Sequence, residues 1–291
     1  MAKPTTQVEE TVKPNEIVVQ NNRSMTPSYL QQDAEDYGGA GLSKRSQDFL
    51  LPFLYVAQSN SPQLNRKQED KYIPGLEVGD IFNTATGKFW KGSEGILVLP
   101  AYYQPAEVEW VTRKAGGGYI DTYQTDDPIV KKVRIDPSDP RTRLTPPGPD
   151  GKTRQLVETR YHFVVDAESL QVVVIGFTSS GLQVSRQWMT LMDQFKTRVK
   201  DRLVTLPSWS RQYLIKTVYR TNDQGDWFQM IVEDKGYSPE NQLDQREMAR
   251  AFFKQAEEKG VVLGRPPEVD VTTATTSANT SGPTIDDEPP I

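Results

Sequence analysis

The chain has 291 residues, a hydrophobic fraction of 36% and a formal net charge of −5. It contains no cysteine, which excludes disulfides, iron–sulfur clusters and thiolate metal sites. No stretch approaches the roughly 18 apolar residues that a membrane span needs, and the first residues form no apolar leader. We therefore expect a cytoplasmic protein that makes no membrane contact.

Charge is unevenly distributed along the chain. Residues 1–40 contain six acids and three bases, and residues 266–291 contain five acids and no base. Removing both segments from the totals of 34 bases and 39 acids leaves 31 bases against 28 acids in residues 41–265. The middle of the chain is therefore slightly basic between two acidic ends, and this asymmetry is more informative than the net charge.

Residues 1–45 are polar and glycine-rich near their end, so we predict a disordered N-terminal arm. A folded core is expected over residues 46–263. Its first part contains short runs of strand composition, broken by turn residues, at 51–56, 79–84, 88–90, 95–104 and 106–112. Such a series is typical of a strongly bent antiparallel sheet or barrel.

The middle of the core combines a strand, a loop and a hairpin. A strand-like run covers residues 128–135. Five prolines follow, and because proline removes a backbone donor we predict a mobile, irregular loop at residues 136–155. Alternating apolar and polar residues then predict a hairpin of strands 156–166 and 170–178.

Helical periodicity first appears after Ser180. One apolar stripe contains Val184, Trp188, Leu191, Met192, Phe195 and Val199. Two further strands are predicted at 211–221 and 226–234, and a last helix is predicted with Ser238 as N-cap and Pro239 at its first position. The order of strands, hairpin, helix, hairpin and helix predicts a β-rich α+β fold with an antiparallel sheet or small barrel.

The sequence offers little for catalysis. The single histidine, His162, lies on a predicted strand beside Arg160, and a structural role is its favoured interpretation. No serine-nucleophile motif or metal-ligand spacing is present, so we predict no catalytic residue, no metal and no cofactor. An Mg-dependent site assembled from distant acids stays open as an alternative.

A nucleic-acid interface is the stronger hypothesis. Residues 178–220 contain eight bases, two acids and several aromatic residues, and the runs 88–91 and 110–114 each combine a tryptophan with two cations. Cations follow phosphates and rings stack on unpaired bases, which suits single-stranded nucleic acid. The candidate binding residues are Lys88, Trp90, Lys91, Trp110, Arg113, Lys114, Arg160, Trp209, Arg211, Tyr213, Lys216, Tyr219 and Trp227.

Four of the five tryptophans can be assigned an orientation from the sequence pattern. Trp188 lies on the apolar helix stripe and is assigned to the core. Trp110 alternates in phase with buried-type residues, so core packing and base stacking are both open. Trp227 is out of phase with its apolar neighbours and is expected to point away from them, while Trp90 between two lysines is expected at the surface.

The last 28 residues, 264–291, read as a disordered linker and acidic tail. Residues 264–284 are rich in threonine, proline and small polar residues, which cannot bury enough apolar surface to offset the entropy of ordering. The acidic tip suits a pocket with a basic rim in a partner protein, or the basic groove of the protein itself. The candidate partner-binding residues are Asp286, Asp287, Glu288, Pro290 and Ile291.

A β-rich core, a low-complexity linker and an acidic tip together resemble bacterial and phage single-stranded DNA-binding proteins. Bacterial members end in acids followed by Pro and Phe, and Asp286, Asp287 and Pro290 match that tip by position. Ile291 replaces the Phe, and two residues are added. The stretches 79–110 and 161–192 also resemble bacteriophage proteins of this kind.

The resemblance implies an OB-like antiparallel barrel or sheet with two helices, and sequence-independent binding of single-stranded DNA in phage replication or recombination. It also implies that the tail recruits replication or recombination proteins and competes for the DNA groove, with a homo-oligomer as a further option and the host cytoplasm as the location. Two alternatives stay open: a virion structural or accessory protein, and a metal-dependent nuclease.

Overall fold

The computed structural model describes residues 51–261, apart from residues 138 and 224. The chain divides into two compact units, residues 1–48 and 49–291, and every described residue belongs to the second. The predicted N-terminal arm and acidic tail therefore lie outside the described residues.

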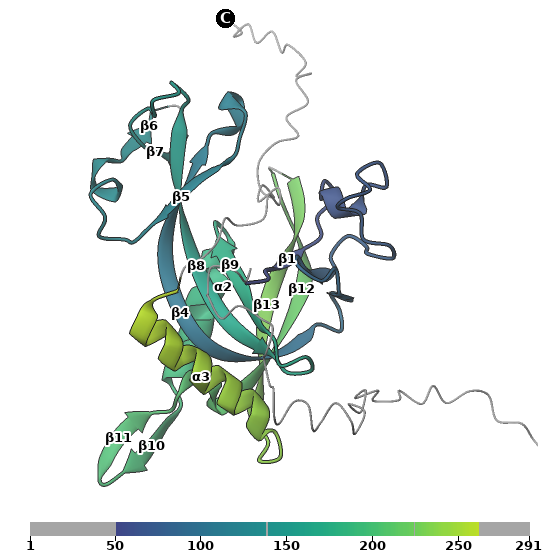
Figure 1. Cartoon of the computed structure of the whole chain (residues 1–291), viewed down its shortest axis with the longest axis vertical. Helices are drawn as coiled ribbons and strands as arrows, with labels where there is room; N and C mark the ends of the chain where they lie inside the picture. Colours follow the sequence, from purple (N-terminus) through teal and green to yellow (C-terminus); the bar gives the residue numbers. More distant parts are fainter. Residues whose placement is uncertain (1–50, 138, 224, 262–291) are drawn as a thin grey trace, which may run out of the picture. The chain divides into compact units, whose positions relative to one another are not determined.

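Five antiparallel strands form the centre of the molecule. The long strand β4 (Ile96–Val111) pairs with β8 (Arg154–Asp166) along nearly its whole length. The other edge of β8 pairs with β9 (Val172–Thr178), while β12 (Arg211–Asn222) pairs with the start of β4 and with β13 (Gly225–Tyr237). The order β13-β12-β4-β8-β9 places the returning strand β12 beside β4, which is a Greek-key arrangement (Figure 1).

The sheet does not close into a barrel. Within the described residues β9 and β13 are not paired with each other. Helix α2 (Gly181–Asp193) contacts both of these strands, and so does β1 (Leu54–Val56), where Phe53 forms a parallel bridge to Val174. The prediction of a β-rich α+β fold is confirmed. Helix α2 and strand β1 occupy the gap between β9 and β13, which a closed barrel would not have.

Shorter strands extend this centre. Strand β5 pairs with the end of β4, β7 pairs with β8 and β6, and β10 and β11 form a separate two-stranded hairpin. Their bounds, with those of β2 and β3 beside β1, are β2 Ile81–Asn83, β3 Phe89–Trp90, β5 Tyr119–Tyr123, β6 Arg134–Asp136, β7 Asp139–Leu144, β10 Lys196–Val199 and β11 Arg202–Thr205. The short 3-10 helices are η2 Pro62–Leu64, η3 Arg113–Ala115, η4 Val130–Lys132 and η5 Ser208–Ser210.

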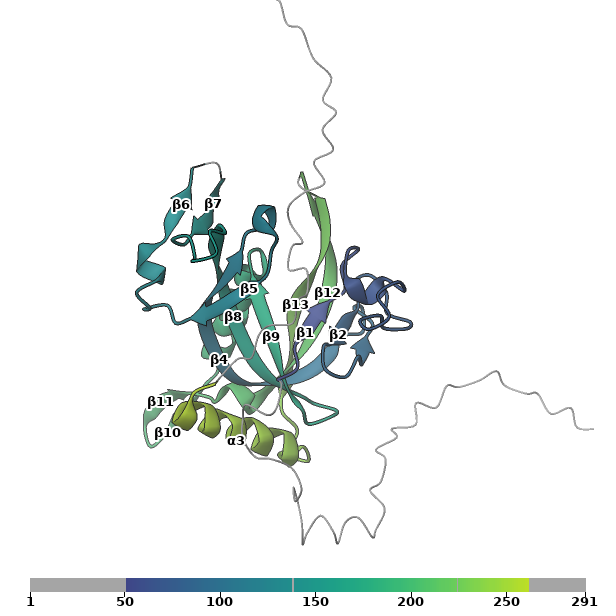
Figure 2. The ribbon, with the colours of Figure 1, turned by 45° about the horizontal axis from the view of Figure 1, so that its top comes forward.

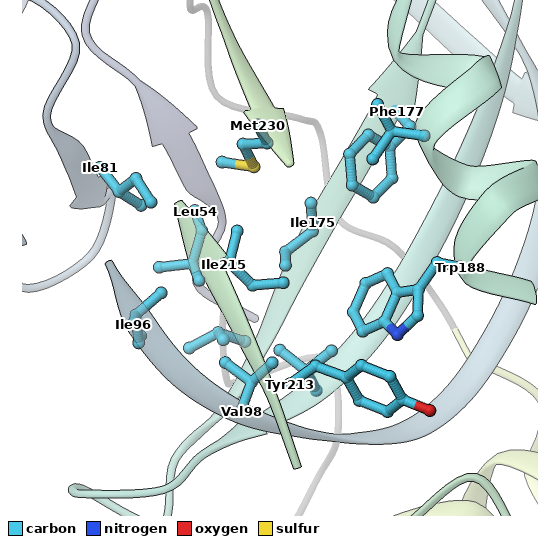
Figure 3. Close-up of a cluster of buried hydrophobic side chains, with 13 residues drawn as sticks. Leu54, Ile81, Ile96, Val98, Ile175, Phe177, Trp188, Tyr213, Ile215 and Met230 are labelled. Atoms are coloured by element: carbon cyan, nitrogen blue, oxygen red, sulfur yellow. The ribbon is translucent and has the colours of Figure 1, made fainter. Parts of the chain in front are cut away.

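The largest core cluster lies between the sheet and α2 (Figure 3). Trp188 is fully buried there, stacked on His162 with ring centroids 4.6 Å apart and edge-on to Tyr213. The predicted core position of Trp188 is therefore confirmed. Burying a tryptophan removes a large apolar area from water, so this residue anchors α2 to the sheet.

Helix α3 (Leu243–Lys259) contacts β4, β8 and η5 (Figure 2). Ala249 is fully buried, and Phe252 stacks on Phe163 of β8 at 5.4 Å. Neither helix of the described chain has the length and apolar character needed to span a bilayer.

Two predictions for the strands differ from the structure. Residues 95–104 and 106–112 form the single strand β4, because a register shift between Pro100 and Tyr102 accommodates the first proline and the strand continues through Pro105. Residues within 136–155, predicted as an irregular loop, include β7 and the start of β8.

The two helices are also shorter than predicted. Helix α2 ends at Asp193, so Val199 of the predicted stripe lies instead in β10. Helix α3 begins at Leu243, because the Ser238 backbone N–H donates to the Ser210 carbonyl and fixes that residue outside the helix. The prediction of Ser238 as N-cap is therefore wrong.

Candidate nucleic-acid interface

Most of the predicted cations already have acidic partners within the protein. Lys88 Nζ lies 2.7 Å from Glu168 Oε2 and 4.9 Å from the centroid of the Trp90 ring. Lys91 Nζ lies 2.7 Å from Glu77 and 3.0 Å from Asp80, and these hydrogen bonds raise the pKa of Lys91. These two lysines reinforce the local fold, which reduces what they can offer to phosphate.

Two further predicted cations are paired on the central strands. Arg160 donates from Nε and Nη2 to Glu158 Oε1, at 3.0 and 2.8 Å. Lys216 Nζ lies 3.6 Å from Glu233. By contrast, Lys114 is exposed and has no acidic partner among the described residues. Lys114 lies within η3, for whose first residue, Arg113, only the backbone is described.

Tyr213 must be removed from the predicted interface. Its side chain is fully buried in the core beside Trp188, and burial raises its pKa to about 12. A ring enclosed on all sides cannot stack on a base while the core stays packed. The alternation of β12 points Tyr213 and Ile215 inward together, which the alternating pattern of 211–221 already contained.

The other predicted rings occupy separate places. Trp90 and Trp110 are half-buried and pack against core clusters, and Trp227 is half-buried with its Nε1 enclosed and lacking a partner. Tyr219 is 56% exposed and lies edge-on to Phe228. Trp90 lies beside Lys88, whereas Trp110 packs against a different core cluster, so the predicted rings do not all share one place.

Trp209, one of the predicted aromatics, lines a pocket formed by described residues. It belongs to η5 and contacts Phe253 of α3, with ring centroids 5.3 Å apart. The open pocket of about 460 Å³ is lined by Ala101, Tyr102, Tyr103, Thr205, Pro207, Ser208, Trp209 and Phe253. Ser208 Oγ donates to the Pro100 carbonyl and holds η5 against β4. Four of the lining residues are aromatic, so the pocket presents rings.

A basic hairpin, β10–β11, begins at the rim of this pocket and projects from the body (Figure 1). We call it the arm and define it as residues 196–205. Every residue of the arm is exposed, and it contains the cations Lys196, Arg198, Lys200 and Arg202 with a single acid, Asp201. Lys196 lies 3.8 Å from Asp193, while no acidic partner is found in the described chain for the other three. Unpaired exposed cations are available to phosphate.

The two faces of the arm differ. Lys196 is directly opposite Thr205, and Arg198 is directly opposite Leu203. Residues opposite each other on paired strands share one face, so these four side chains form the pocket face of the arm. Because Thr205 also lines the pocket, the cations of this face lie next to the aromatic lining of the pocket.

The base of the arm is held by Arg211. Its guanidinium donates to both carboxylate oxygens of Asp234 at 2.7 to 3.1 Å, and this hydrogen bonding raises the pKa of Arg211. The same group lies 3.7 Å from the ring centroid of Phe195 and 4.6 Å from that of Tyr237. Arg211 therefore has a positioning role, because it fixes Phe195 immediately before β10.

The structure thus favours one candidate interface, which we call the arm–pocket surface: Tyr102, Tyr103, Trp209 and Phe253 with Lys196 and Arg198. Of these six residues, only Trp209 is among the predicted binding residues. The arm cations belong to the basic run 178–220, but the helical interpretation of residues 195–199 concealed that they lie on a projecting hairpin.

The only histidine has a structural position. His162 is buried, its Nε2 lies 2.8 Å from Ser185 Oγ, and burial lowers its pKa to about 3. It therefore stays neutral at physiological pH and is enclosed away from the surface. Within the described residues, no group of three or more acidic or histidine side chains is arranged to hold a metal ion.

Comparison with known proteins places the chain in a family. A model of the Pam3 phage gp34-like protein family matches residues 20–261, which is most of the chain. The chain belongs to this family. As a Pam3 phage gp34-like protein it has the expected bacteriophage origin, and the match spans the whole arm–pocket surface but not the acidic tip. No curated protein and no solved structure matches it.

Proposed function

We propose that this phage protein binds single-stranded DNA, without sequence preference, at the arm–pocket surface. The observation that carries the proposal is the continuity between an aromatic pocket and the cationic pocket face of an exposed arm. The proposal assigns the protein a binding role in phage replication or recombination, with no catalytic step, metal or cofactor.

The chemistry of the surface favours single strands over duplex. Stacking a base on an aromatic ring contributes about 1–3 kcal/mol, and it requires an unpaired base with an accessible face. Tyr102 and Trp209, which both contact Phe253, offer such rings. Lys196 and Arg198 follow on the same surface, where they can contact the phosphates of the next nucleotides.

The strand order supports an OB-type assignment of the core. The order β13-β12-β4-β8-β9, with α2 in the connection between β9 and β12, is a five-stranded Greek key. The OB fold is a partly open five-stranded Greek-key barrel that binds oligonucleotides. We propose that this protein has an opened version of that fold, with α2 and β1 filling the gap.

Titration of labelled oligo-dT, followed by fluorescence anisotropy, tests the proposal. The wild-type chain is expected to bind oligo-dT more tightly than a duplex of equal length. Trp209→Ala should weaken binding on the order of tenfold or more, because one stacking platform is lost. Trp209→Phe keeps a ring in the pocket and should retain most of the affinity.

Two results would overturn the proposal: no binding of oligo-dT at low salt, or equal binding by Trp209→Ala and wild type. Circular dichroism of both variants shows whether they keep the secondary-structure content of the wild type. Cleavage of the labelled oligonucleotide in the presence of Mg²⁺ would instead support a nuclease.

The acidic tail adds two proposals that rest on its charge. We propose that residues 286–291 recruit replication or recombination proteins and compete with DNA for the cationic arm. Deleting residues 284–291 should leave oligo-dT affinity equal or higher. A loss of affinity after the deletion would refute the competition.

A virion structural or accessory role is the second candidate. The exposed apolar residues of the arm favour it, since Leu203 is 66% exposed and a projecting hairpin of this kind also suits contact with protein. Co-sedimentation with purified phage particles, without binding to oligo-dT, would favour this role.

A further inference from the structure

Most of the strongly exposed apolar residues in the described chain lie at one end. Nine large apolar side chains are strongly exposed in the described chain. Six of them lie on the arm, at its base or on the first half of α3: Val199, Leu203, Val204, Tyr237, Leu243 and Met248. Both views show the arm and α3 at the same end (Figures 1 and 2). Exposed apolar groups that gather in this way mark an interaction surface.

The arm contributes one half of this surface. Val199 is directly opposite Arg202, and Thr197 is directly opposite Val204. These four side chains form the outer face of the arm, on the side away from the pocket face. Within the described residues, β10 and β11 pair only with each other, so each has an unpaired edge. The outer face thus combines two exposed valines with a cation.

The first half of α3 contributes the other half. Leu243 and Glu247 are four residues apart, and so are Asp244 and Met248. Residues at this spacing are neighbours on a helix surface, so the four form one exposed face with two apolar and two acidic members, flanked by the exposed Arg250 three residues after Glu247. We call it the α3 face. Its apolar content resembles that of the outer face, and its charge is opposite.

We propose that the protein forms a two-fold symmetric dimer in which the outer face of each arm packs on the α3 face of the other copy. Both complementary halves are present on the same chain, so a two-fold axis between two copies makes the contact twice and closes the assembly at two copies. Val199 and Val204 bury against Leu243 and Met248. Arg202 faces the carboxylates, which fixes the register of the contact.

An intramolecular contact between the same two faces is disfavoured by the geometry of the pocket. Thr205 of the arm and Phe253 of α3 line that pocket together, so the pocket face is the side of the arm that turns towards its own α3. The outer face turns away from it. A second copy supplies the α3 face that the outer face needs.

The oligomeric state of the full chain tests the proposal. Light scattering coupled to size-exclusion chromatography is expected to give twice the chain mass of 32.9 kDa. The double variant Val199→Asp with Val204→Asp should raise the dimer dissociation constant at least about tenfold. Because both positions are exposed, the monomeric fold should be unchanged in circular dichroism.

A charge-reversal cycle makes the test specific. Arg202→Glu should weaken the dimer, and so should the pair Asp244→Lys with Glu247→Lys. Combining all three substitutions should restore it. The matched control Lys196→Glu reverses a charge on the pocket face and should leave the dimer intact.

Three outcomes would overturn the dimer. The first is a wild-type chain that stays monomeric at its highest soluble concentration, and the second is a dimer indifferent to the outer-face aspartates. The third is failure of the combined charge reversal to restore a dimer that the single reversals had weakened. These measurements use no nucleic acid, so they stand apart from the proposed DNA binding.

Discussion

Protonation of the buried His162 should make stability depend on pH in a predictable way. The ring is enclosed by Trp188 at 4.6 Å, Tyr103 at 5.1 Å and Phe177 at 5.4 Å, and Nε2 bonds to Ser185. Burial, together with a smaller contribution from Arg160 on the same strand, lowers its pKa to about 3. In the unfolded chain the pKa returns to about 6.5.

The sign of the effect follows from the lowered pKa. Below pH 6.5 the unfolded chain binds a proton that the folded chain rejects until about pH 3. Stability is therefore unaffected by this group above pH 6.5, and it is lost as pH falls from about 6.5 towards 3. Between pH 7 and pH 5, linkage gives a loss of about 2 kcal/mol in the free energy of unfolding.

Urea denaturation at pH 7, 6 and 5, followed by tryptophan fluorescence, measures this loss. His162→Gln keeps a hydrogen-bonding side chain near Ser185 but cannot be protonated. Carboxylates whose pKa is lowered in the folded state, such as Asp150 and Glu233, destabilise both proteins equally on acidification. The difference between the two pH slopes therefore isolates the histidine. Equal slopes in wild type and variant would refute the burial argument.

Three further predictions concern the fold that supports the arm–pocket surface. Asp234→Asn should cost about 1 kcal/mol of unfolding free energy and speed tryptic cleavage within the arm, because Arg211 loses a charged acceptor; unchanged cleavage would contradict the positioning role. Gly92→Ala should lower the free energy of unfolding in urea by about 1–3 kcal/mol or more, since its new methyl would collide with a backbone carbonyl. The control Gly117→Ala meets only open space and should cost about 1 kcal/mol, because its backbone is left-handed. Trp188→Ala should cost about 3–5 kcal/mol in the same assay, and a loss below 1 kcal/mol would show that α2 does not depend on it.

The central hairpin of β8 and β9 could be predicted from sequence, because the residues of each strand are enough to indicate that strand. Alternation sets the inward side of each strand, and a short polar turn joins them. The buried position of Trp188 followed equally directly from the period of the helix stripe. In both cases the deciding information lies within about twenty residues of the chain.

The arm could not be predicted in this way. Phe195 and Val199 continue the apolar period of the preceding helix, so a local pattern favours more helix. The chain instead leaves the helix after Asp193 and reverses at Lys200 and Asp201, both of which have positive φ. Asp seldom signals such a turn without a following glycine, so the reversal has a weak sequence signal.

The composition of the interface was equally hidden. The pocket joins residues from Ala101 to Phe253, and no spacing rule connects positions so far apart. Ion pairing was the second obstacle, because Lys91 and Arg211 appear available in sequence but have partners 11 and 23 residues away. Counting cations in the sequence therefore overestimates the number of unpaired cations, because the fold places acidic partners beside some of them.

The salt dependence of oligo-dT binding tests the proposed interface most directly. Affinity for single strands falls with salt by a logarithmic slope of about 0.7 for each phosphate that is neutralised. Lys196→Ala with Arg198→Ala should therefore reduce the slope by about 1.4 and weaken binding at low salt. The control Lys67→Ala with Lys71→Ala, which removes two exposed cations from the segment between β1 and β2, should keep the wild-type slope. Identical slopes for the arm variant and wild type would contradict the arm–pocket surface as the DNA site.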